Sequence, residues 1–571
     1  MHAPWRSALL LLSLVAVAVA VAAAEGAGPA PPISSTAAHQ QPAEPGAGEA
    51  AALVGLVSAM GADQQLLASL NETVAREGTL CGWHFQHLGS FSSDILCNNA
   101  TGAITSVYLS GHFNGTLPIH GWQALGSLAE LSVGFPLSGQ LAAAFPDSLQ
   151  ELYLASNSFT AISPDWRPPP HLHNLSLLYN QLNQTLEQQQ SWLAAAPELQ
   201  VLDLDHNSLH GTVPIDLALP PSLTQLSLSS NKLSSTLPPI RLPRSLQNLT
   251  LSENQLSGSL PQGWVLPPSL NLMYLYSNRF SGTLPVDVEL PPSLQILNLD
   301  SNALSGTIPA TWLPPNLTHF GASNNRLSLP PNGYLPLPPS LVRLVLSDNP
   351  LNGPIPSSLS NATSLKELEL NTCSLSGTLP AAPLPPSLES LSLASNSLSG
   401  SVPWAAWDLP ASLDFLSLAS NRLTGPLPAT LPASLESFSL GGNALSGTLP
   451  AQLLASLPAS FDVSSNRLTG PLPPALALSP GSLSGPLKPA WIDLSNNSLS
   501  GPLSSGWDCG LGCRLNLSSN QLSGPLDLEG PAPSFNPTWL AYDTVDLSLN
   551  RLTDQMICAP VVDILPSALA F

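Results

Sequence analysis

The chain has 571 residues, of which 43% are apolar and only 9% charged, and its formal net charge is −21. This acidic balance argues against a nucleic-acid partner, because binding to phosphates requires a basic surface. A basic peptide, a basic protein or a neutral carbohydrate is compatible with it.

The N-terminal segment has the pattern of a secretory signal. Arg6 precedes a short apolar run over residues 8–24 that ends in three alanines. We predict a signal peptide at residues 1–24, with an uncleaved signal anchor as the alternative. The protein is therefore expected to be secreted or at the cell surface, and attached to a membrane only if the signal is retained or the chain is truncated.

A linker and a helical cap are predicted to follow. Residues 25–50 are rich in Ala, Pro, Gly and Gln and lack apolar periodicity, which is typical of a disordered linker. Apolar residues between Leu53 and Leu70 recur near helical spacing. We expect residues 51–103 to form a cap, because a repeat array without one exposes its apolar core at the end.

The six cysteines gather near the two ends of a repetitive region. Two stand before it, one inside it and three near its end: Cys81 and Cys97, Cys373, and Cys509, Cys513 and Cys558. Such placement predicts caps closed by disulfides in an oxidising compartment, with bonds at Cys81, Cys97, Cys509 and Cys513. Whether Cys509 and Cys513 bond to each other, or one of them to Cys558, is left open.

One template recurs from residue 104 to residue 553: Leu-x-x-Leu-x-Leu-x-x-Asn-x-Leu-x-Gly-x-Leu-Pro, as in the stretch 294–309. Seventeen copies spaced mostly 22 to 25 residues apart, with two looser copies before them, make about nineteen repeats. Asparagine fills its slot in all but one of the seventeen, where Cys373 replaces it. These asparagines are Asn157, Asn180, Asn207, Asn231, Asn254, Asn278, Asn302, Asn325, Asn349, Asn396, Asn421, Asn443, Asn466, Asn497, Asn520 and Asn550.

Each slot of the template has a physical reason. Leu-x-Leu predicts a short strand whose leucines fill the core while alternate residues face outward, so stacked repeats form a parallel sheet. The asparagine amide can satisfy buried backbone groups where the chain leaves the strand. Cys373 is expected to be buried and free.

The other half of each repeat often reads Leu-Pro-Pro-Ser-Leu, as at 219–223 and 266–270. Paired prolines forbid a regular helix there and favour extended segments and 3₁₀ turns. Trp264, Trp312, Trp404 and Trp407 lie in this half and are expected to pack beneath it. The predicted fold is a helix-poor leucine-rich-repeat solenoid of the α/β class.

The run Asn-x-Leu-Ser-Gly-x-Leu-Pro, as at 254–261, resembles the plant-specific class of extracellular leucine-rich repeats. Cys81-Gly82-Trp83 with Cys97 resembles the N-terminal cap of that family. The resemblance covers about residues 52–560. It implies a right-handed twisted superhelix with a parallel sheet on its concave face, as in receptor-like proteins, receptor kinases and polygalacturonase-inhibiting proteins, which bind peptides, steroids, proteins or cell-wall enzymes.

The chain departs from that family in two ways. Leu-Pro-Pro-Ser-Leu replaces the usual Leu-Gly-Asn-Leu type of stretch, and no kinase or membrane segment follows the repeats. Residues 554–571 are expected to be a C-terminal cap or the start of a truncated repeat. A truncated receptor ectodomain is therefore one alternative for this chain.

Motifs for chemistry are missing from the sequence. It contains no metal-ligand spacing, no phosphate-binding glycine loop and no Gly-x-Ser-x-Gly elbow. We expect no enzyme activity, no catalytic residue, no metal and no cofactor.

The register of the repeats predicts which side chains face outward on the concave sheet. In the first half they include four of the seven tyrosines, whereas the second half offers mostly Ser, Ala and Gly. Clustered tyrosine and aspartate suit a binding patch, although tyrosine also simply suits strands. The predicted ligand-binding residues are Tyr153, Tyr179, Asp203, Asp205, His206, Tyr274, Tyr276, Asn298, Asp300 and Arg343.

Ten Asn-x-Ser/Thr sequons are candidate glycosylation sites in a secreted chain. They are Asn71, Asn99, Asn114, Asn174, Asn183, Asn248, Asn316, Asn361, Asn496 and Asn516. Three of them, Asn174, Asn248 and Asn516, fall at the margin of the concave face, where a glycan would narrow the approach of a ligand.

The leading hypothesis is an extracellular recognition module that binds a peptide, protein or carbohydrate on the concave face, with a membrane co-receptor as a further partner. The alternatives are an inhibitor of secreted cell-wall-degrading enzymes and a structural wall or matrix protein. The Ser-rich second half would suit a matrix protein.

Overall fold

The computed structural model describes residues 46–86, 92–111, 113–134, 136–331, 333–454, 457–473, 491–503, 514–524 and 545–552. The predicted signal peptide, Cys509, Cys513, Cys558 and the predicted C-terminal segment 554–571 lie outside these residues. Within the described residues, no helix is long and apolar enough to cross a membrane.

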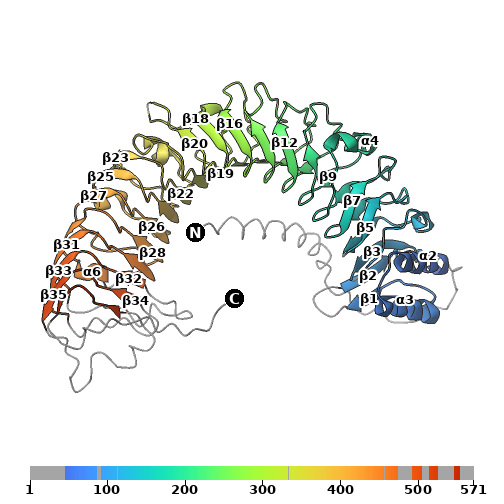
Figure 1. The fold of residues 1–571 in the computed structure, drawn as a ribbon, viewed down its shortest axis with the longest axis horizontal. Helices are drawn as coiled ribbons and strands as arrows, with labels where there is room; N and C mark the ends of the chain where they lie inside the picture. The colour runs from blue at the N-terminus through green and yellow to red at the C-terminus, as the bar shows by residue number, and fades with distance from the viewer. Residues whose placement is uncertain are drawn as a thin grey trace, which may run out of the picture. The chain divides into compact units, whose positions relative to one another are not determined.

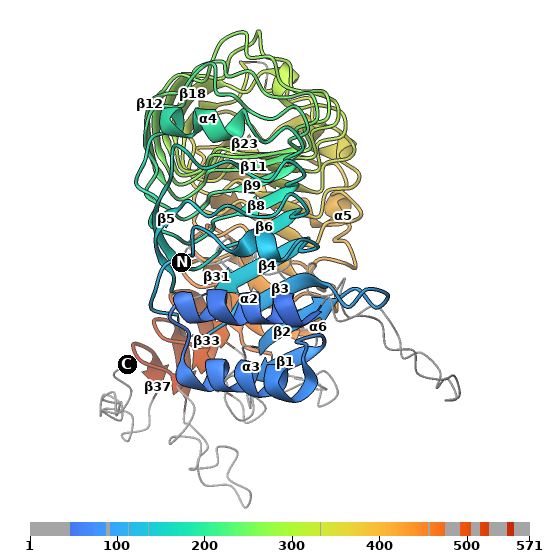
Figure 2. The same cartoon turned by 90° about the vertical axis from the view of Figure 1, so that its right-hand side faces the viewer.

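The cap contains two helices, α2 (Gly46–Ala59) and α3 (Gln64–Glu77), where the sequence suggested one. The chain turns between them at Gly61, whose φ is +71°, and Asp63 then caps α3 by accepting the Leu66 N–H at 2.7 Å. Helix α2 begins at Gly46, so the boundary expected at residue 50 was wrong. Figure 2 shows both helices at the N-terminal end of the repeats.

A hairpin joins the cap to the repeats. Strands β1 (Trp83–Gln86) and β2 (Ser92–Cys97) pair antiparallel, and β2 pairs antiparallel with β3 (Ile104–Ser110), the strand of the first repeat. A disulfide links Cys81 to Cys97. The hairpin therefore covers an edge of the sheet that would otherwise be unpaired.

The repeats build one long sheet of 21 strands, which follows the inner side of the arc in Figure 1. Without β1 and β2, the other nineteen strands are parallel, one for each expected repeat. After β3 they are β4 (Glu130–Gly134), β6 (Glu151–Tyr153), β8 (Asn174–Ser176), β9 (Val201–Asp203), β11 (Gln225–Ser227), β13 (Asn248–Thr250), β15 (Leu272–Tyr274), β17 (Ile296–Asn298), β19 (His319–Gly321), β21 (Arg343–Val345), β22 (Glu367–Glu369), β24 (Ser390–Ser392), β26 (Phe415–Ser417), β28 (Ser437–Ser439), β30 (Ser460–Asp462), β32 (Trp491–Asp493), β34 (Arg514–Asn516) and β36 (Val545–Asp546). The solenoid prediction is confirmed.

A second series of short parallel sheets, which the sequence did not lead us to expect, lies toward the outer side of the arc (Figure 1). Its strands are β5 (Ser138–Leu141) and β7 (Ser158–Ile162); β10 (His210–Gly211), β12 (Lys232–Thr236), β14 (Gln255–Gly258), β16 (Arg279–Thr283), β18 (Ala303–Thr307) and β20 (Arg326–Ser328); β23 (Ser376–Thr378), β25 (Ser397–Ser401) and β27 (Arg422–Thr424); β29 (Ser446–Gly447), β31 (Arg467–Pro471), β33 (Ser498–Gly501), β35 (Gln521–Gly524) and β37 (Arg551–Leu552). The series is interrupted after β20, where Pro350 follows Asn349 and has no N–H to donate to a ladder.

The asparagine of each repeat ties two repeats together. Asn349, 1% exposed, donates from Nδ2 to the carbonyl oxygen of Ala322 in the preceding repeat and to that of Leu346 in its own. Its Oδ1 accepts the N–H of Leu327 at 2.8 Å. Cys373 occupies the same place as a buried free cysteine, as expected, and its Sγ donates to the carbonyl of Leu346.

The proline-rich half of the repeat is extended and poor in helix, as predicted. Its serine bonds backward: Ser269 Oγ donates to the carbonyl oxygens of Arg244 and Leu246 in the preceding repeat. Trp264, Trp312 and Trp407 are buried beneath this half, whereas Trp404 is only partly buried. The short helices are η1 (Trp122–Ala124), η2 (Leu186–Gln189), α4 (Gln190–Leu193), η3 (Ala310–Trp312), η4 (Ser357–Asn361), α5 (Trp404–Trp407) and α6 (Ala451–Leu454).

Candidate functional site: the concave face

The concave face is formed by the outward side chains of the long sheet and of the turn that follows each strand. The residue just before the asparagine adopts a left-handed conformation, with φ of 54° at Tyr179 and 52° at His206. This conformation is costly for a residue with a side chain. The asparagine that follows holds the turn, because its amide bonds the carbonyls around it.

Seven side chains on strands β8 to β15 and their turns form what we call the central patch. They are Tyr179, Asp203, Asp205, His206, Glu253, Tyr274 and Tyr276. Tyr179 stacks on His206 with ring centroids 4.2 Å apart and is 49% exposed. Tyr274 meets Tyr276 edge to face at 5.8 Å. The patch combines aromatic area with carboxylates, and Glu253 is a member that the sequence did not lead us to predict.

The two aspartates of the central patch are held by backbone N–H groups. Asp203 accepts the N–H of Asp205 at 3.1 Å, and Asp205 accepts the N–H of Ser229, in the turn after β11, at 2.5 Å. Burial raises the pKa of both carboxyls, and the charge of Asp203 raises that of Asp205 further. A cation brought to this place would offset both the burial and the mutual repulsion of the two carboxylates.

Tyrosine–glutamate pairs lie on the N-terminal side of the central patch. Tyr153 donates from its hydroxyl to Glu151 at 2.6 Å. Tyr108 donates likewise to Glu130 at 2.5 Å. Burial, then the glutamate, raises the pKa of both hydroxyls. Tyr108, Glu130 and Glu151 were not among the predicted residues, although they occupy the same register slots.

On the C-terminal side of the central patch, Arg343 pairs with Glu367 at 2.8 Å. Burial raises the pKa of Glu367 to about 7, and a hydrogen bond with Glu369 adds to the shift. Burial, followed by the charge of Arg343, lowers the pKa of His319. Asn298, a predicted ligand residue, is only 4% exposed and its Oδ1 accepts the N–H of Asp300, so it offers little surface to a ligand.

The second half of the concave face is lined mostly by serine, alanine and glycine on strands β24 to β30. Two large exposed residues lie in this half, Phe415 on β26 at 37% and Trp491 on β32 at 44%. Neither was predicted, because neither stands in a cluster of tyrosines. The tyrosines of the concave face therefore all lie between β3 and β22.

Replacing Asp300 by asparagine is expected to stabilise the protein at neutral pH. Burial raises the pKa of Asp300 to about 6, so the folded chain binds this proton more tightly than the unfolded chain. The charged form opposes folding above about pH 6, and the penalty fades as the pH falls towards 4. Asparagine removes the charge and keeps an oxygen that can accept the Ser323 N–H.

The gain should be about 1–2 kcal/mol at pH 7 and vanish near pH 4, measured as the difference in unfolding midpoint between variant and wild type. The control is D216N, which changes an exposed aspartate in the convex half. An Asp300→Asn gain independent of pH would contradict this account of the site.

The sequons occupy different parts of the repeat. Asn99, Asn114 and Asn361 are exposed. Asn71 and Asn316 are also exposed, but their amides donate to the carbonyls of Leu67 and Pro292. Asn183 and Asn496 are exposed as well, whereas Asn174, Asn248 and Asn516 are partly buried. Asn174 and Asn248 begin strands β8 and β13, on either side of Asp203 and Asp205, so a glycan there would limit the directions from which a ligand reaches the central patch.

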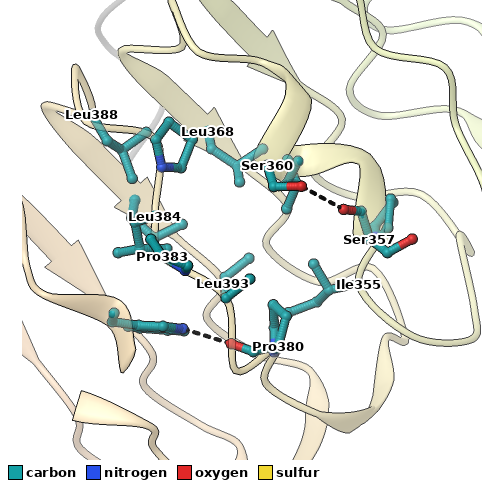
Figure 3. Close-up of a pocket in the computed structure, with 15 residues that line it drawn as sticks. Ile355, Ser357, Ser360, Leu368, Pro380, Pro383, Leu384, Leu388 and Leu393 are labelled. Atoms are coloured by element: carbon teal, nitrogen blue, oxygen red, sulfur yellow. Dashed lines mark hydrogen bonds between the residues drawn. The ribbon is translucent and has the colours of Figure 1, made fainter. Parts of the chain in front are cut away.

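A cavity of about 40 Å³ lies beneath the convex half, between η4 and Trp407 (Figure 3). Apolar residues such as Ile355, Leu384 and Leu393 line it, and Trp407 Nε1 closes one side by donating to the carbonyl of Pro380. It is too small for more than a methyl group or a water molecule. Among the described residues, no group of three His, Cys, Asp or Glu side chains is placed to hold a metal ion.

Comparison with protein families matches the leucine-rich repeat at residues 198–219, 222–241, 245–265, 293–313, 340–362 and 387–409. No curated protein sequence matches the chain. Solved structures do match it. The PEPR1–AtPEP1 crystal structure is 27% identical, with 88% of this chain and 68% of that chain covered and a TM-score of 0.66.

Two further receptor structures are similar. The Arabidopsis receptor kinase HAESA, in complex with the peptide hormone IDA and the co-receptor SERK1, is 26% identical, with 88% of this chain and 86% of that chain covered and a TM-score of 0.62. The plant peptide hormone receptor RGFR1, in complex with RGF2, is 25% identical, with 81% and 79% covered and a TM-score of 0.57.

Proposed function

Because this chain belongs to the plant extracellular class of leucine-rich-repeat proteins, we propose that it is a recognition protein whose concave face binds a peptide. One of the similar structures, HAESA, is in complex with the peptide hormone IDA, and another is the peptide hormone receptor RGFR1 in complex with RGF2. The observation that carries the proposal is the central patch, which combines two pairs of aromatic rings with three interacting carboxylates on nearby repeats.

The ligand is a peptide with basic side chains. Strands β3 to β22 and their turns carry nine carboxylates: Glu130, Glu151, Asp203, Asp205, Glu253, Asp300, Asp348, Glu367 and Glu369. The long-sheet strands among them carry one arginine, Arg343, which already pairs with Glu367. A lysine or arginine of the ligand can pair with Asp205 and Glu253 while its aliphatic stem packs on Tyr276.

Secretion, glycosylation and a membrane co-receptor belong to the same proposal. The disulfide of the cap supports an oxidising compartment. The co-receptor SERK1 is present in the HAESA complex. By analogy, a membrane co-receptor would bind a lateral surface of the present solenoid. In this proposal the protein acts by binding its ligand and not by catalysis.

The experiment that tests the proposal is a binding screen of the secreted full chain against an arrayed library of short peptides. We expect the bound peptides to be enriched in lysine and arginine, and their binding to weaken as salt is added. Bound peptides that contain no excess of basic residues, or an array with no bound peptide, would argue for the matrix or inhibitor reading.

A further inference from the structure

Six of the fifteen lysines and arginines stand at one position of the repeat, directly after the ladder asparagine. We call them the cationic row: Lys232, Arg279, Arg326, Arg422, Arg467 and Arg551. The chain as a whole carries 36 acidic residues, so a gathering of cations in one register slot stands out against the composition.

The six cations have the same geometry. Each is the first residue of a strand of the second sheet series, is exposed, and is followed by a more deeply buried leucine or phenylalanine. Five of them pair in register with a serine of the preceding repeat, as Arg279 does with Ser257 and Arg326 with Ser305. Equal register along a solenoid places the six side chains along one flank, beside the concave face.

No member of the cationic row forms an ion pair within the described part of the chain. The fourteen strands from β10 to β37 in the second series contain no aspartate and no glutamate. The side chains between the cations are mostly hydroxyls, for example Ser281, Thr283 and Thr307. The flank is therefore a polar surface on which the positive charges occupy the same position of each strand that carries one.

We infer that this flank binds a linear acidic polysaccharide whose carboxylates pair with the cationic row. Arginine recognises carboxylates through two parallel hydrogen bonds, and the intervening serine and threonine hydroxyls can bond sugar hydroxyls. These strands expose no large apolar residue, so they lack the anchors that a protein partner uses. Nucleic acid carries phosphates far more densely than this row carries cations.

The polysaccharide site is separate from the central patch, because the two surfaces use different strands of each repeat. Binding on the flank would hold the protein in an acidic matrix while the concave face stays open. Failure of either proposal leaves the other standing.

The test measures binding of the full chain to oligomers of polygalacturonate at low salt. We expect binding that salt weakens and that methyl esterification of the carboxylates abolishes. The double variant Arg279→Gln/Arg326→Gln should bind roughly tenfold more weakly, since it removes two charge-assisted contacts. The matched control is Arg241→Gln/Arg244→Gln, which removes the same charge from two exposed arginines in the proline-rich half and should bind like wild type.

Three outcomes would overturn the inference: no binding of polygalacturonate, equal binding of its methyl ester, or an equal loss in the control variant. Polyglutamate is included as a polyanion without sugar, and tighter binding to it than to polygalacturonate would contradict the assignment to a polysaccharide. The concave variant Tyr274→Ala/Tyr276→Ala should retain the polysaccharide, which separates this test from that of peptide recognition.

Discussion

Replacing Asn349 by alanine lowers the free energy of unfolding of the surrounding repeats by about 3–4 kcal/mol, because several buried hydrogen bonds are lost together. The Leu327 N–H and the Ala322 carbonyl are left without the amide that joins the two repeats. The turn at Asp348, with φ of 57°, also loses its support. Amide hydrogen exchange across β19, β21 and β22 measures the loss locally, which suits a long array that does not unfold in one step.

Cysteine at the same position provides a graded comparison. Cys373 already fills this slot one repeat later, where its Sγ bonds the carbonyls of Leu346 and Asn371. Asn349→Cys should therefore cost less than Asn349→Ala. Asn361→Ala, at an exposed asparagine of η4, should cost little. If all three variants lose equal stability, the ladder of asparagines is not what holds adjacent repeats together.

The double variant Tyr274→Ala/Tyr276→Ala is expected to lose roughly hundredfold in affinity for a basic peptide that the wild type binds, because aromatic anchors at the centre of an interface contribute about 1–2 kcal/mol each. The two rings meet edge to face in the middle of the central patch. Titration calorimetry with the tightest peptide of the array measures the change.

Phe415→Ala is the matched control for this loss, since Phe415 is an exposed aromatic residue of the same long sheet, on strand β26 and outside the central patch. It should leave peptide affinity unchanged. An equal loss in the Phe415 variant, or none in the double tyrosine variant with its unfolding midpoint preserved, would move the site away from the central patch.

The repeat register could be predicted from sequence because each slot obeys a local rule. A leucine at alternate positions must be buried, and an asparagine after it has the donors and acceptor that an exit turn requires. These rules need no knowledge of distant residues. The expected nineteen parallel strands and the buried free Cys373 follow from them.

The second sheet series was missed because its strands, such as Arg279–Thr283, contain glycine and serine and bury only one leucine or phenylalanine. Propensity argues against strands of that composition. They form because stacking brings identical backbones into register, with Gly282 at φ of +74°. That requirement arises between repeats and cannot be seen in one repeat alone.

The predicted ligand-binding residues of the concave face also depend on contacts between repeats that the sequence does not show. Register placed Tyr179 and His206 on one face, but their stacking depends on two left-handed turns in adjacent repeats. Asn298 lies on the same face, yet its Oδ1 accepts the N–H of Asp300 and only 4% of the residue is exposed. Glu253 was not predicted, although it stands directly before a ladder asparagine, as His206 does.

The cationic row could have been found from the sequence, because its signal is the register itself. Lysine and arginine recur directly after the asparagine at positions 232, 279, 326, 422, 467 and 551. The structure adds that these side chains share one flank and that no carboxylate lies among their strands.

The most direct test of the account is hydrogen–deuterium exchange of the full chain with and without a bound basic peptide. Recognition at the central patch predicts slower exchange at the ends of β9, β13 and β15 and in the turns that hold His206 and Glu253, with strands β24 to β30 unchanged. Protection confined to β24–β30, or to the second sheet series, would contradict the placement of the recognition site.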